Sequence, residues 1–289
     1  MWVVLAFGSA FFAGITSILA KIGIKKTDST LATAIRTIVV LLMSFIMVLI
    51  VGSLNSIVDI STKSWIFLTL SGLATGASWL CYFKALQLGN VNQVVPIDKS
   101  STIMSILLAF VILQEPINWL KGVCIVVIAV GTFLMIEKKE VDPNKKTNKL
   151  WILFAFLSAI FAALTSILGK IGIEGVESNL GTFLRTAVVL VMSWLMVLVT
   201  KKGSGLKNID KKELLFICLS GLATGASWLC YYKALQDGLA SVVVPIDKLS
   251  ILITVAFSFF VLKEKLSLKA LIGLILIVAG TLCMLIPLP

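Results

Sequence analysis

The chain is built from one unit that occurs twice. Residues 70–86, LSGLATGASWLCYFKAL, recur at 219–235 as LSGLATGASWLCYYKAL, and the copies differ only where Phe83 is replaced by Tyr232. The offset of 149 residues also joins matching positions over the rest of the chain without a gap. A repeat of this length restricts the fold to two copies of one structural unit.

The duplication predicts three segments. We expect a first five-helix unit over residues 1–137, a basic linker over 138–149 and a second five-helix unit over 150–289. Each unit contains five apolar stretches of about 20 residues, which is the length a helix needs to cross a bilayer. The predicted spans are 2–24, 31–51, 64–88, 91–113 and 119–136, then 151–173, 180–200, 214–237, 240–262 and 267–287.

Composition places the chain in a membrane. Hydrophobic residues make up 59% of the sequence and charged residues 13%, and the mean hydropathy is +1.07. Soluble domains carry about 25% charged residues. A soluble helical bundle is the alternative, but the span lengths favour a bilayer. The predicted fold class is therefore an all-α polytopic membrane protein with ten transmembrane helices, placed in the bacterial plasma membrane.

Five spans per unit is an odd number, so tandem copies must insert with opposite orientations. Inverted repeats around a central cavity are a recurrent plan of secondary transporters. Lysines gather in the loops after the first, fifth, seventh and ninth spans. Because basic short loops stay in the cytoplasm, we predict a cytoplasmic linker and both termini outside.

Each unit also carries charged residues inside its apolar spans. A charge at the centre of a membrane helix costs roughly 2.5–3.5 kcal/mol, so such side chains tend to face a cavity or a partner. The first set is Lys21, Arg36, Lys84, Asp98 and Lys99, and the second is Lys170, Arg185, Lys233, Asp247 and Lys248. With four cations to one carboxylate in each set, the expected ligand is anionic or zwitterionic.

Several of these residues have structural alternatives. Lys21 and its repeat mate lie near span ends, from which a lysine side chain can reach water. Arg36 and its repeat mate are alternatively structural ties to a neighbouring carboxylate. Lys84 and Lys233 fit either alternative, a lysine that reaches water from a span end or a structural tie to a carboxylate.

The Asp-Lys pairs follow a proline, which interrupts the hydrogen bonds of a helix. Asp98-Lys99 and Asp247-Lys248 lie too deep for the lysines to reach water easily. Adjacent helical residues project about 100° apart, so each pair is poorly placed for an internal ion pair. We predict that the two sets form gates on opposite sides of a midplane cavity.

An aromatic wall completes the predicted binding and gating set. Trp79, Tyr82, Trp228 and Tyr231 belong to this set, and Phe83 and Tyr232 extend the expected wall. Packing or interfacial anchoring is the alternative for all six. The small-residue stripe at Gly72 and Gly76 predicts close helix packing, with a backbone-lined substrate path as the alternative. Glu115 and Glu264 lie at span ends and are expected to orient or cap the following helix.

Enzymatic chemistry is not expected. The chain has no histidine, no CxxC motif and no P-loop, so the sequence predicts neither metal nor cofactor. The net charge of +11 does not indicate nucleic acid, because the lysines lie mostly in short loops between spans.

These features resemble the ten-span EamA-type transporters of the drug/metabolite transporter superfamily. The resemblance rests on the gap-free five-plus-five duplication, the Gly-rich third span ending Tyr82-Phe83-Lys84-Ala85-Leu86, and the close of each half. Those closes read Leu113-Gln114-Glu115-Pro116 and Leu262-Lys263-Glu264-Lys265-Leu266. The resemblance implies a basket-like fold whose first four helices per half line the path, with the fifth at the periphery.

The resemblance also bears on orientation and on substrate. Many ten-span relatives keep both termini in the cytoplasm, whereas the lysines here indicate the reverse. Related phosphate-sugar translocators bind phosphate with basic residues on the fourth and ninth helices, where Lys99 and Lys248 fall.

The predicted function is secondary active transport of a small anionic or zwitterionic metabolite by alternating access. The alternatives are a multidrug or cation exporter, and a non-transporting accessory or lipid-handling membrane protein. The expected partners are a small-molecule substrate and membrane lipid, without nucleic acid. Because the duplication already supplies two units, a monomer is sufficient, and a homodimer is the alternative.

Overall fold

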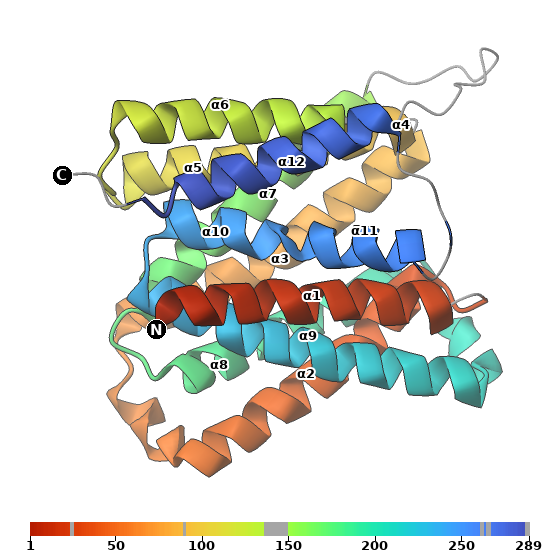
Figure 1. Cartoon of the computed structure of the whole chain (residues 1–289). Helices are drawn as coiled ribbons and strands as arrows, with labels where there is room; N and C mark the ends of the chain where they lie inside the picture. Colours follow the sequence, from red (N-terminus) through yellow and green to blue (C-terminus); the bar gives the residue numbers. More distant parts are fainter. Residues whose placement is uncertain (24–25, 89–90, 136–149, 261–262, 264–266, 287–289) are drawn as a thin grey trace.

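The computed structural model describes residues 1–23, 26–88, 91–135, 150–260, 263 and 267–286. Within them the chain is helical, with no strand (Figure 1). The first unit comprises α1 (Trp2–Gly23), α2 (Ser29–Val51), η1 (Ser53–Asp59), α3 (Thr62–Leu88), α4 (Val91–Lys99), α5 (Ser101–Ile112) and α6 (Trp119–Leu134). The second comprises α7 (Leu150–Ile173), α8 (Ser178–Val199), η2 (Gly203–Asn208), α9 (Lys211–Asp237), α10 (Ala240–Lys248), α11 (Ser250–Phe260) and α12 (Leu268–Cys283).

The helices have the lengths that a membrane requires. Seven segments of the described chain are long and apolar enough to cross a bilayer, and α6 and α12 are shorter apolar helices. The prediction of an all-helical, multi-pass protein is confirmed at this level, while the count of ten spans stays a prediction.

The predicted fourth and ninth spans are each broken into two helices. α4 ends at Lys99 and α10 ends at Lys248, and a new helix begins two residues later in each case. The ninth span breaks just after Pro245, which cannot donate a backbone hydrogen bond. A tighter turn follows it, in which the Leu249 amide donates to the Ile246 carbonyl at 2.9 Å.

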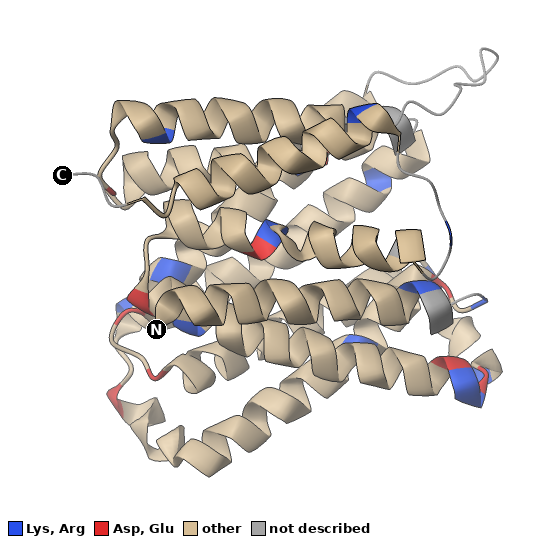
Figure 2. Cartoon of the chain, viewed as in Figure 1, with Lys and Arg blue, Asp and Glu red and all other residues tan. Residues whose placement is uncertain are grey.

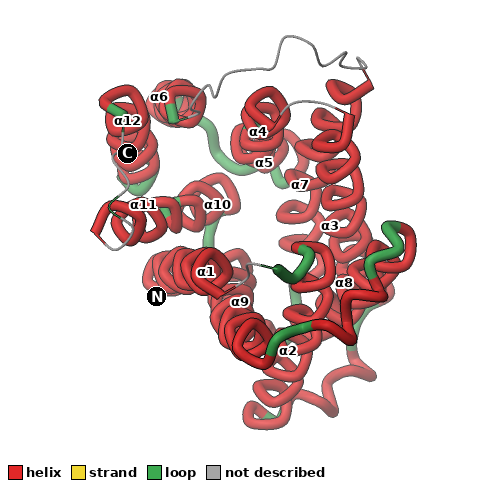
Figure 3. The backbone as a smooth tube through the Cα atoms, turned by 90° about the vertical axis from the view of Figure 1, so that its right-hand side faces the viewer, coloured by secondary structure: helices red, strands yellow, loops and turns green. Residues whose placement is uncertain are grey.

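The two units interlock, because each long helix packs mainly against the other unit. α3 lies along α7, α1 along α9, α2 along α8, and α6 along α12. Viewed along the helices, α6 and α12 stand together at one edge of the bundle (Figure 3). This agrees with the peripheral place that the family resemblance implies for the last helix of each half.

The small-residue stripe on α3 is a packing seam, as predicted. A Cβ atom at Gly72 would lie 2.7 Å from the Val188 Cβ atom, and one at Gly76 would lie 2.5 Å from the Met192 Cβ atom. Both contacts are closer than real Cβ atoms approach, so these glycines allow α3 to touch α8.

The seam between α6 and α12 supplies a matched stability test. A Cβ atom at Gly131 would lie 2.7 Å from the Gly273 carbonyl oxygen, whereas a Cβ atom at Gly122 would meet nothing within 4 Å. We expect Gly131→Ala to lower the free energy of unfolding by about 1–3 kcal/mol, because two backbones must separate. Gly122→Ala is expected to be neutral or stabilising by up to about 1 kcal/mol. Thermal unfolding in detergent measures both, and equal melting temperatures for the two variants would contradict the expectation.

Candidate functional site

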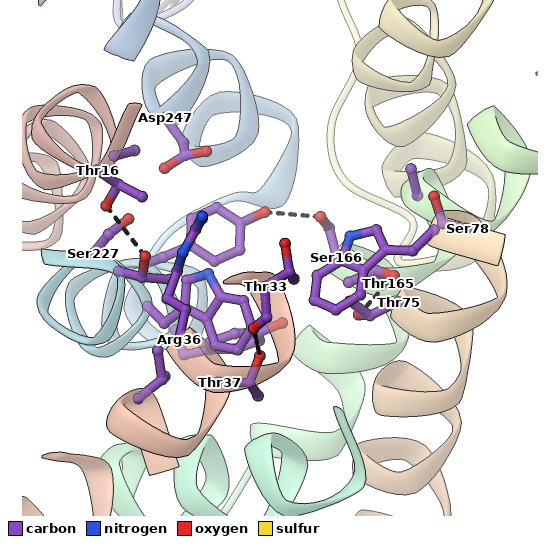
Figure 4. Close-up of a pocket in the computed structure, with 18 of the residues that line it drawn as sticks. Thr16, Thr33, Arg36, Thr37, Thr75, Ser78, Thr165, Ser166, Ser227 and Asp247 are labelled. Atoms are coloured by element: carbon purple, nitrogen blue, oxygen red, sulfur yellow. Dashed lines mark hydrogen bonds between the residues drawn. The ribbon is translucent and has the colours of Figure 1, made fainter. Parts of the chain in front are cut away.

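A cavity of about 550 Å³ lies among α1, α2, α3, α7, α8, α9 and α10 (Figure 4). Its walls combine hydroxyl groups, aromatic rings and four charged side chains. The hydroxyl side chains are Thr16, Ser17, Thr33, Thr37, Thr75, Ser78, Thr165, Ser166, Thr224 and Ser227. The aromatic residues are Trp79, Trp228, Tyr231 and Tyr232, and the charged ones are Arg36, Arg185, Asp247 and Lys248.

The hydroxyl lining was not predicted from the sequence. A signal for it was present, because these residues recur at the repeat offset. Thr16 and Ser17 correspond to Thr165 and Ser166, and all four line the cavity. The cavity is therefore built by equivalent faces of the two units.

Arg185 is held tightly in the cavity wall and is only 2% exposed. Its Nε donates to Ser71 Oγ at 3.0 Å and its Nη2 to Thr75 Oγ1 at 2.6 Å. The guanidinium carbon lies 5.0 Å from the Trp228 ring centroid and 4.8 Å from that of Tyr232. The structural alternative, a tie to a neighbouring carboxylate, is replaced here by hydroxyl and ring contacts among the described residues. Hydroxyls and aromatic faces stabilise the cation without neutralising it, so its charge stays in the cavity.

Arg36, the repeat mate of Arg185, has a different environment. It is half-buried and lines the cavity. Its Nε is buried without a hydrogen-bond partner among the described residues. A buried, unpaired guanidinium nitrogen is costly and requires an explanation. Arg185 shares the feature at one nitrogen, since its Nη1 also lacks a partner within the described chain.

Asp247 and Lys248 reach the cavity because α10 ends there. Asp247 Oδ1 accepts from Ser9 Oγ at 2.6 Å, and Ser9 Oγ lies 3.2 Å from Ser227 Oγ. Lys248 Nζ stands 4.0 Å from Asp247 Oδ2, a long contact that agrees with the expectation that these helical neighbours are poorly placed to pair. The acidic and basic residues where α10 ends colour the ribbon red and blue midway along the bundle (Figure 2).

Asp98 repeats the arrangement of Asp247 outside this cavity. Its Oδ1 accepts from Ser158 Oγ at 2.8 Å, and Ser158 Oγ lies 3.3 Å from Ser78 Oγ. Neither Asp98 nor the exposed Lys99 is among the residues that line the cavity.

The structure brings seven of the twelve predicted site residues together and leaves five elsewhere. Tyr82 packs beside Ala85 and Val94. Lys84 lines a separate pocket of about 570 Å³ beside Asp28. Lys233 Nζ lies 2.9 Å from Asp237 Oδ1. The aromatic wall is formed by Trp79, Trp228 and Tyr231, together with Tyr232.

Side chains of the second unit tie one end of the bundle, the end at which Glu115, Glu174 and Gly238 lie. We call it the Glu115 end, and it lies on the left of Figure 1. Gln236 Nε2 donates to the carbonyls of Ile173 at 2.8 Å and Val176 at 2.6 Å. These bonds tie α9 to the end of α7.

Two further charged groups strengthen the Glu115 end. Lys170 Nζ donates to the carbonyls of Leu235 and Gly238, so it does not extend to water as the alternative held. Buried Glu115 accepts from the amides of Ala240 at 2.6 Å and Ser241 at 2.9 Å. Glu115 thus caps α10 of the other unit rather than the helix that follows it. Glu264 lies outside the described residues.

The opposite end holds Asp28, Lys202 and Glu213, and we call it the Asp28 end. Glu213 accepts from the amides of Lys26 at 2.9 Å and Thr27 at 3.0 Å. Lys202 pairs with Asp28 at 2.9 Å. Burial raises the pKa of Asp28, but hydrogen bonds from Lys202 and from the Thr30 amide outweigh it, so the pKa lies below its usual value. Gln87, the repeat mate of Gln236, is exposed and lines the pocket here.

Comparisons with known proteins agree with the duplicated architecture. The profile of the EamA-like transporter family matches residues 1–137 and 149–286. An uncharacterized transporter of Sinorhizobium sp. is 42% identical over 135 residues, which are 96% of its chain and 47% of this one. An uncharacterized protein of Methanocaldococcus jannaschii is 32% identical over 129 residues, or 91% of its chain and 45% of this one.

Two longer matches cover more of the chain. An uncharacterized transporter of Synechocystis sp. is 23% identical over 242 residues, which are 79% of this chain and 68% of its own. A crystal structure titled only as that of a protein has a TM-score of 0.77 at 14% identity, covering 98% of this chain and 96% of its own. The latter shows a shared fold.

Proposed function

This chain belongs to the EamA-like transporter family, and from that membership we propose that it is a secondary transporter of a small organic anion or zwitterion. The observation that carries the substrate class is the central cavity. It holds three cations, Arg36, Arg185 and Lys248, against one carboxylate, Asp247. An excess of positive charge in a site with low-dielectric walls concentrates anions.

The cavity also has the features of a site for a polar metabolite. Its many hydroxyls supply donors and acceptors that fix orientation, and the aromatic rings supply apolar faces. Guanidinium groups bind carboxylate and phosphate through paired hydrogen bonds. Asp247 is available to accept from a cationic group of a zwitterion.

Alternating access is supported by the difference between the two ends. Gln236 ties α9 to α7 at the Glu115 end, whereas its repeat mate Gln87 is exposed and lines a pocket at the Asp28 end. Other contacts between the units remain at the Asp28 end, from Lys202 to Asp28 and from Glu213 to the amides of Lys26 and Thr27. We propose that ten helices form two inverted repeats, with unit boundaries at 137 and 150, and that each end is tied in turn. The lysines favour the Asp28 end as the cytoplasmic one, in a bacterial plasma membrane.

Cation export is the competing function. The excess of cations in the cavity opposes it, because a cationic drug would have to approach three positive groups.

Ligand-induced thermal stabilisation of the purified protein tests the proposal. Amino acids, carboxylates, phosphorylated metabolites and lipophilic cations are screened in parallel. A ligand that binds only the folded state at 100 times its Kd adds about 2.7 kcal/mol to the free energy of unfolding. We expect one anionic or zwitterionic class to stabilise the protein. Lys248→Gln should weaken this shift, and Lys207→Gln, at an exposed lysine of η2 outside the cavity, serves as the control.

The screen has outcomes that decide between the two functions. Stabilisation by lipophilic cations alone would replace the proposal with drug export. Uptake or counterflow of the identified compound into proteoliposomes then tests transport itself.

A further inference from the structure

We infer that the two arginines have different tasks in this conformation, an inference that rests on the proposed function. Arg36 binds the anionic group of the substrate, and Arg185 is a positioning residue that the cavity wall holds in place. The repeat makes the two residues equivalent in sequence, so the difference lies in their surroundings. The sequence contains no other arginine.

Arg185 is committed to the protein. Two of its three nitrogens donate to Ser71 and Thr75 of α3, and its plane lies near two rings of α9. Because Arg185 belongs to α8, these contacts join three helices across both units. Moving this guanidinium to a ligand would break two charge-assisted hydrogen bonds and two cation–π contacts.

Arg36 has no equivalent attachment. The repeat mates of Ser71 and Thr75 are Ser220 and Thr224, and neither hydroxyl accepts a bond from Arg36 among the described residues. Thr224 otherwise makes the same contacts as Thr75, which bonds to the Ser71 carbonyl and lies 3.3 Å from Thr165 Oγ1. Ser220 Oγ donates to the Ile217 carbonyl at 2.8 Å, and Thr224 Oγ1 donates to the Ser220 carbonyl at 2.7 Å and lies 3.2 Å from Thr16 Oγ1. The structure gives Arg36 no hydrogen bond or ion pair among the described residues, although it faces the cavity (Figure 4).

The two units also differ at the repeat position whose ring lies beside Arg185. Tyr232 lies under Arg185 and is fully buried, whereas Phe83 lines the pocket at the Asp28 end. This is the single difference within the 17-residue repeated segment. Arg185 therefore contacts both hydroxyls and the tyrosine ring. Arg36 has no hydrogen bond to the equivalent hydroxyls within the described chain.

A single free guanidinium defines the ligand group. One arginine presents a planar fork that matches one carboxylate or one phosphate bidentately. The site thus selects a substrate with one strongly bound anionic group, with Asp247 and the hydroxyls facing the remainder of the molecule. Lys248 also lines the cavity and contributes charge without a fork.

Arginine-selective modification tests the division of tasks without a known substrate. The protein in nanodiscs is treated with phenylglyoxal, and the modification rate at each arginine is measured by peptide mass spectrometry. With two arginines in the chain, every adduct is assigned to Arg36 or Arg185. We expect Arg36 to react about tenfold faster, the factor that one charge-assisted hydrogen bond supplies.

Two paired variants test whether the slow modification of Arg185 is caused by its hydrogen bonds to Ser71 and Thr75 or only by its burial. Ser71→Ala/Thr75→Val should raise the rate at Arg185 about tenfold, because its tethers are gone. Ser220→Ala/Thr224→Val changes the same residue types at the repeat-related positions and should leave both rates unchanged. Size-exclusion profiles verify that each variant is folded.

Three results would overturn the inference: equal rates in the unmodified protein, a faster rate at Arg185, or no response of Arg185 to loss of its tethers. The rate comparison in the unmodified protein needs no variant. The labelling requires neither ligand nor transport. A contrary labelling result therefore refutes the division of tasks between the arginines, whereas the proposed function is tested separately by the ligand screen. An inorganic phosphate arm adds a ligand readout, in which protection confined to Arg36 supports its role as the ligand-binding residue and protection confined to Arg185 contradicts it.

Discussion

Replacing Arg36 by glutamine is expected to lower the affinity for the transported anion about 100-fold. Removing one partner of a buried, hydrogen-bonded charge pair costs about 2–5 kcal/mol, and a factor of 100 corresponds to about 2.7 kcal/mol. Arg36→Lys keeps the charge but loses the planar fork, so we expect an intermediate loss of about tenfold. Thermal-shift titration with the compound found in the screen measures each affinity.

Arg185→Gln is the matched control for this substitution. It removes the contacts to Ser71, Thr75 and two rings, so its main effect should be a lower melting temperature without ligand. Arg36→Gln should leave that melting temperature unchanged or raise it, because a buried unpaired nitrogen is removed. Retained affinity in Arg36→Gln, with lost affinity in a stable Arg185→Gln protein, would reverse the roles.

Glu115→Ala is expected to cause a large loss of stability, about 3 kcal/mol in the free energy of unfolding. The buried carboxylate accepts two amide hydrogen bonds at the start of α10. Hydrogen bonds to charged groups contribute about 1.5–3 kcal/mol each, and the alanine variant leaves both amides without their acceptor. The lost cap should also loosen α10, which carries Asp247 and Lys248 into the cavity.

Glu115→Gln is the conservative comparison. Its single amide oxygen can keep one of the two bonds, so the expected loss is about half as large. Thermal and denaturant unfolding in detergent measure the three proteins. Equal stability of Glu115→Ala and the unsubstituted chain would show that water replaces the carboxylate and that the cap does not hold α10.

The sequence was a reliable guide to the helices and to half of the site. Charged residues inside apolar spans are rare, so Arg36, Arg185 and the Asp247-Lys248 pair could be selected before their neighbours were known. The hydroxyl lining could not be selected in this way. Serine and threonine bond readily to their own helix, as Thr75 does to the Ser71 carbonyl, and are therefore common in spans without a role in binding.

The different environments of repeat-related residues in the two halves could not be predicted from the sequence for another reason. Lys99 and Lys248, or Tyr82 and Tyr231, occupy equivalent positions in the two units. No sequence pattern can distinguish them, because their different surroundings depend on how the helices of the whole bundle pack in this conformation. The attachment of Arg185 to hydroxyls instead of a carboxylate likewise depends on which helix of the other unit lies alongside.

Joining two copies in one polypeptide changes what mutation can achieve. In an assembly of two identical single-unit chains, any substitution appears on both sides, and the two directions of movement stay energetically matched. Here residue 232 is a tyrosine and its repeat mate 83 is a phenylalanine, so the two halves differ at the ring that lies beside Arg185. In the proposed alternating-access cycle, covalent fusion allows a substitution in one half alone to shift the preference between the two states, and the Phe83/Tyr232 difference is a substitution of this kind.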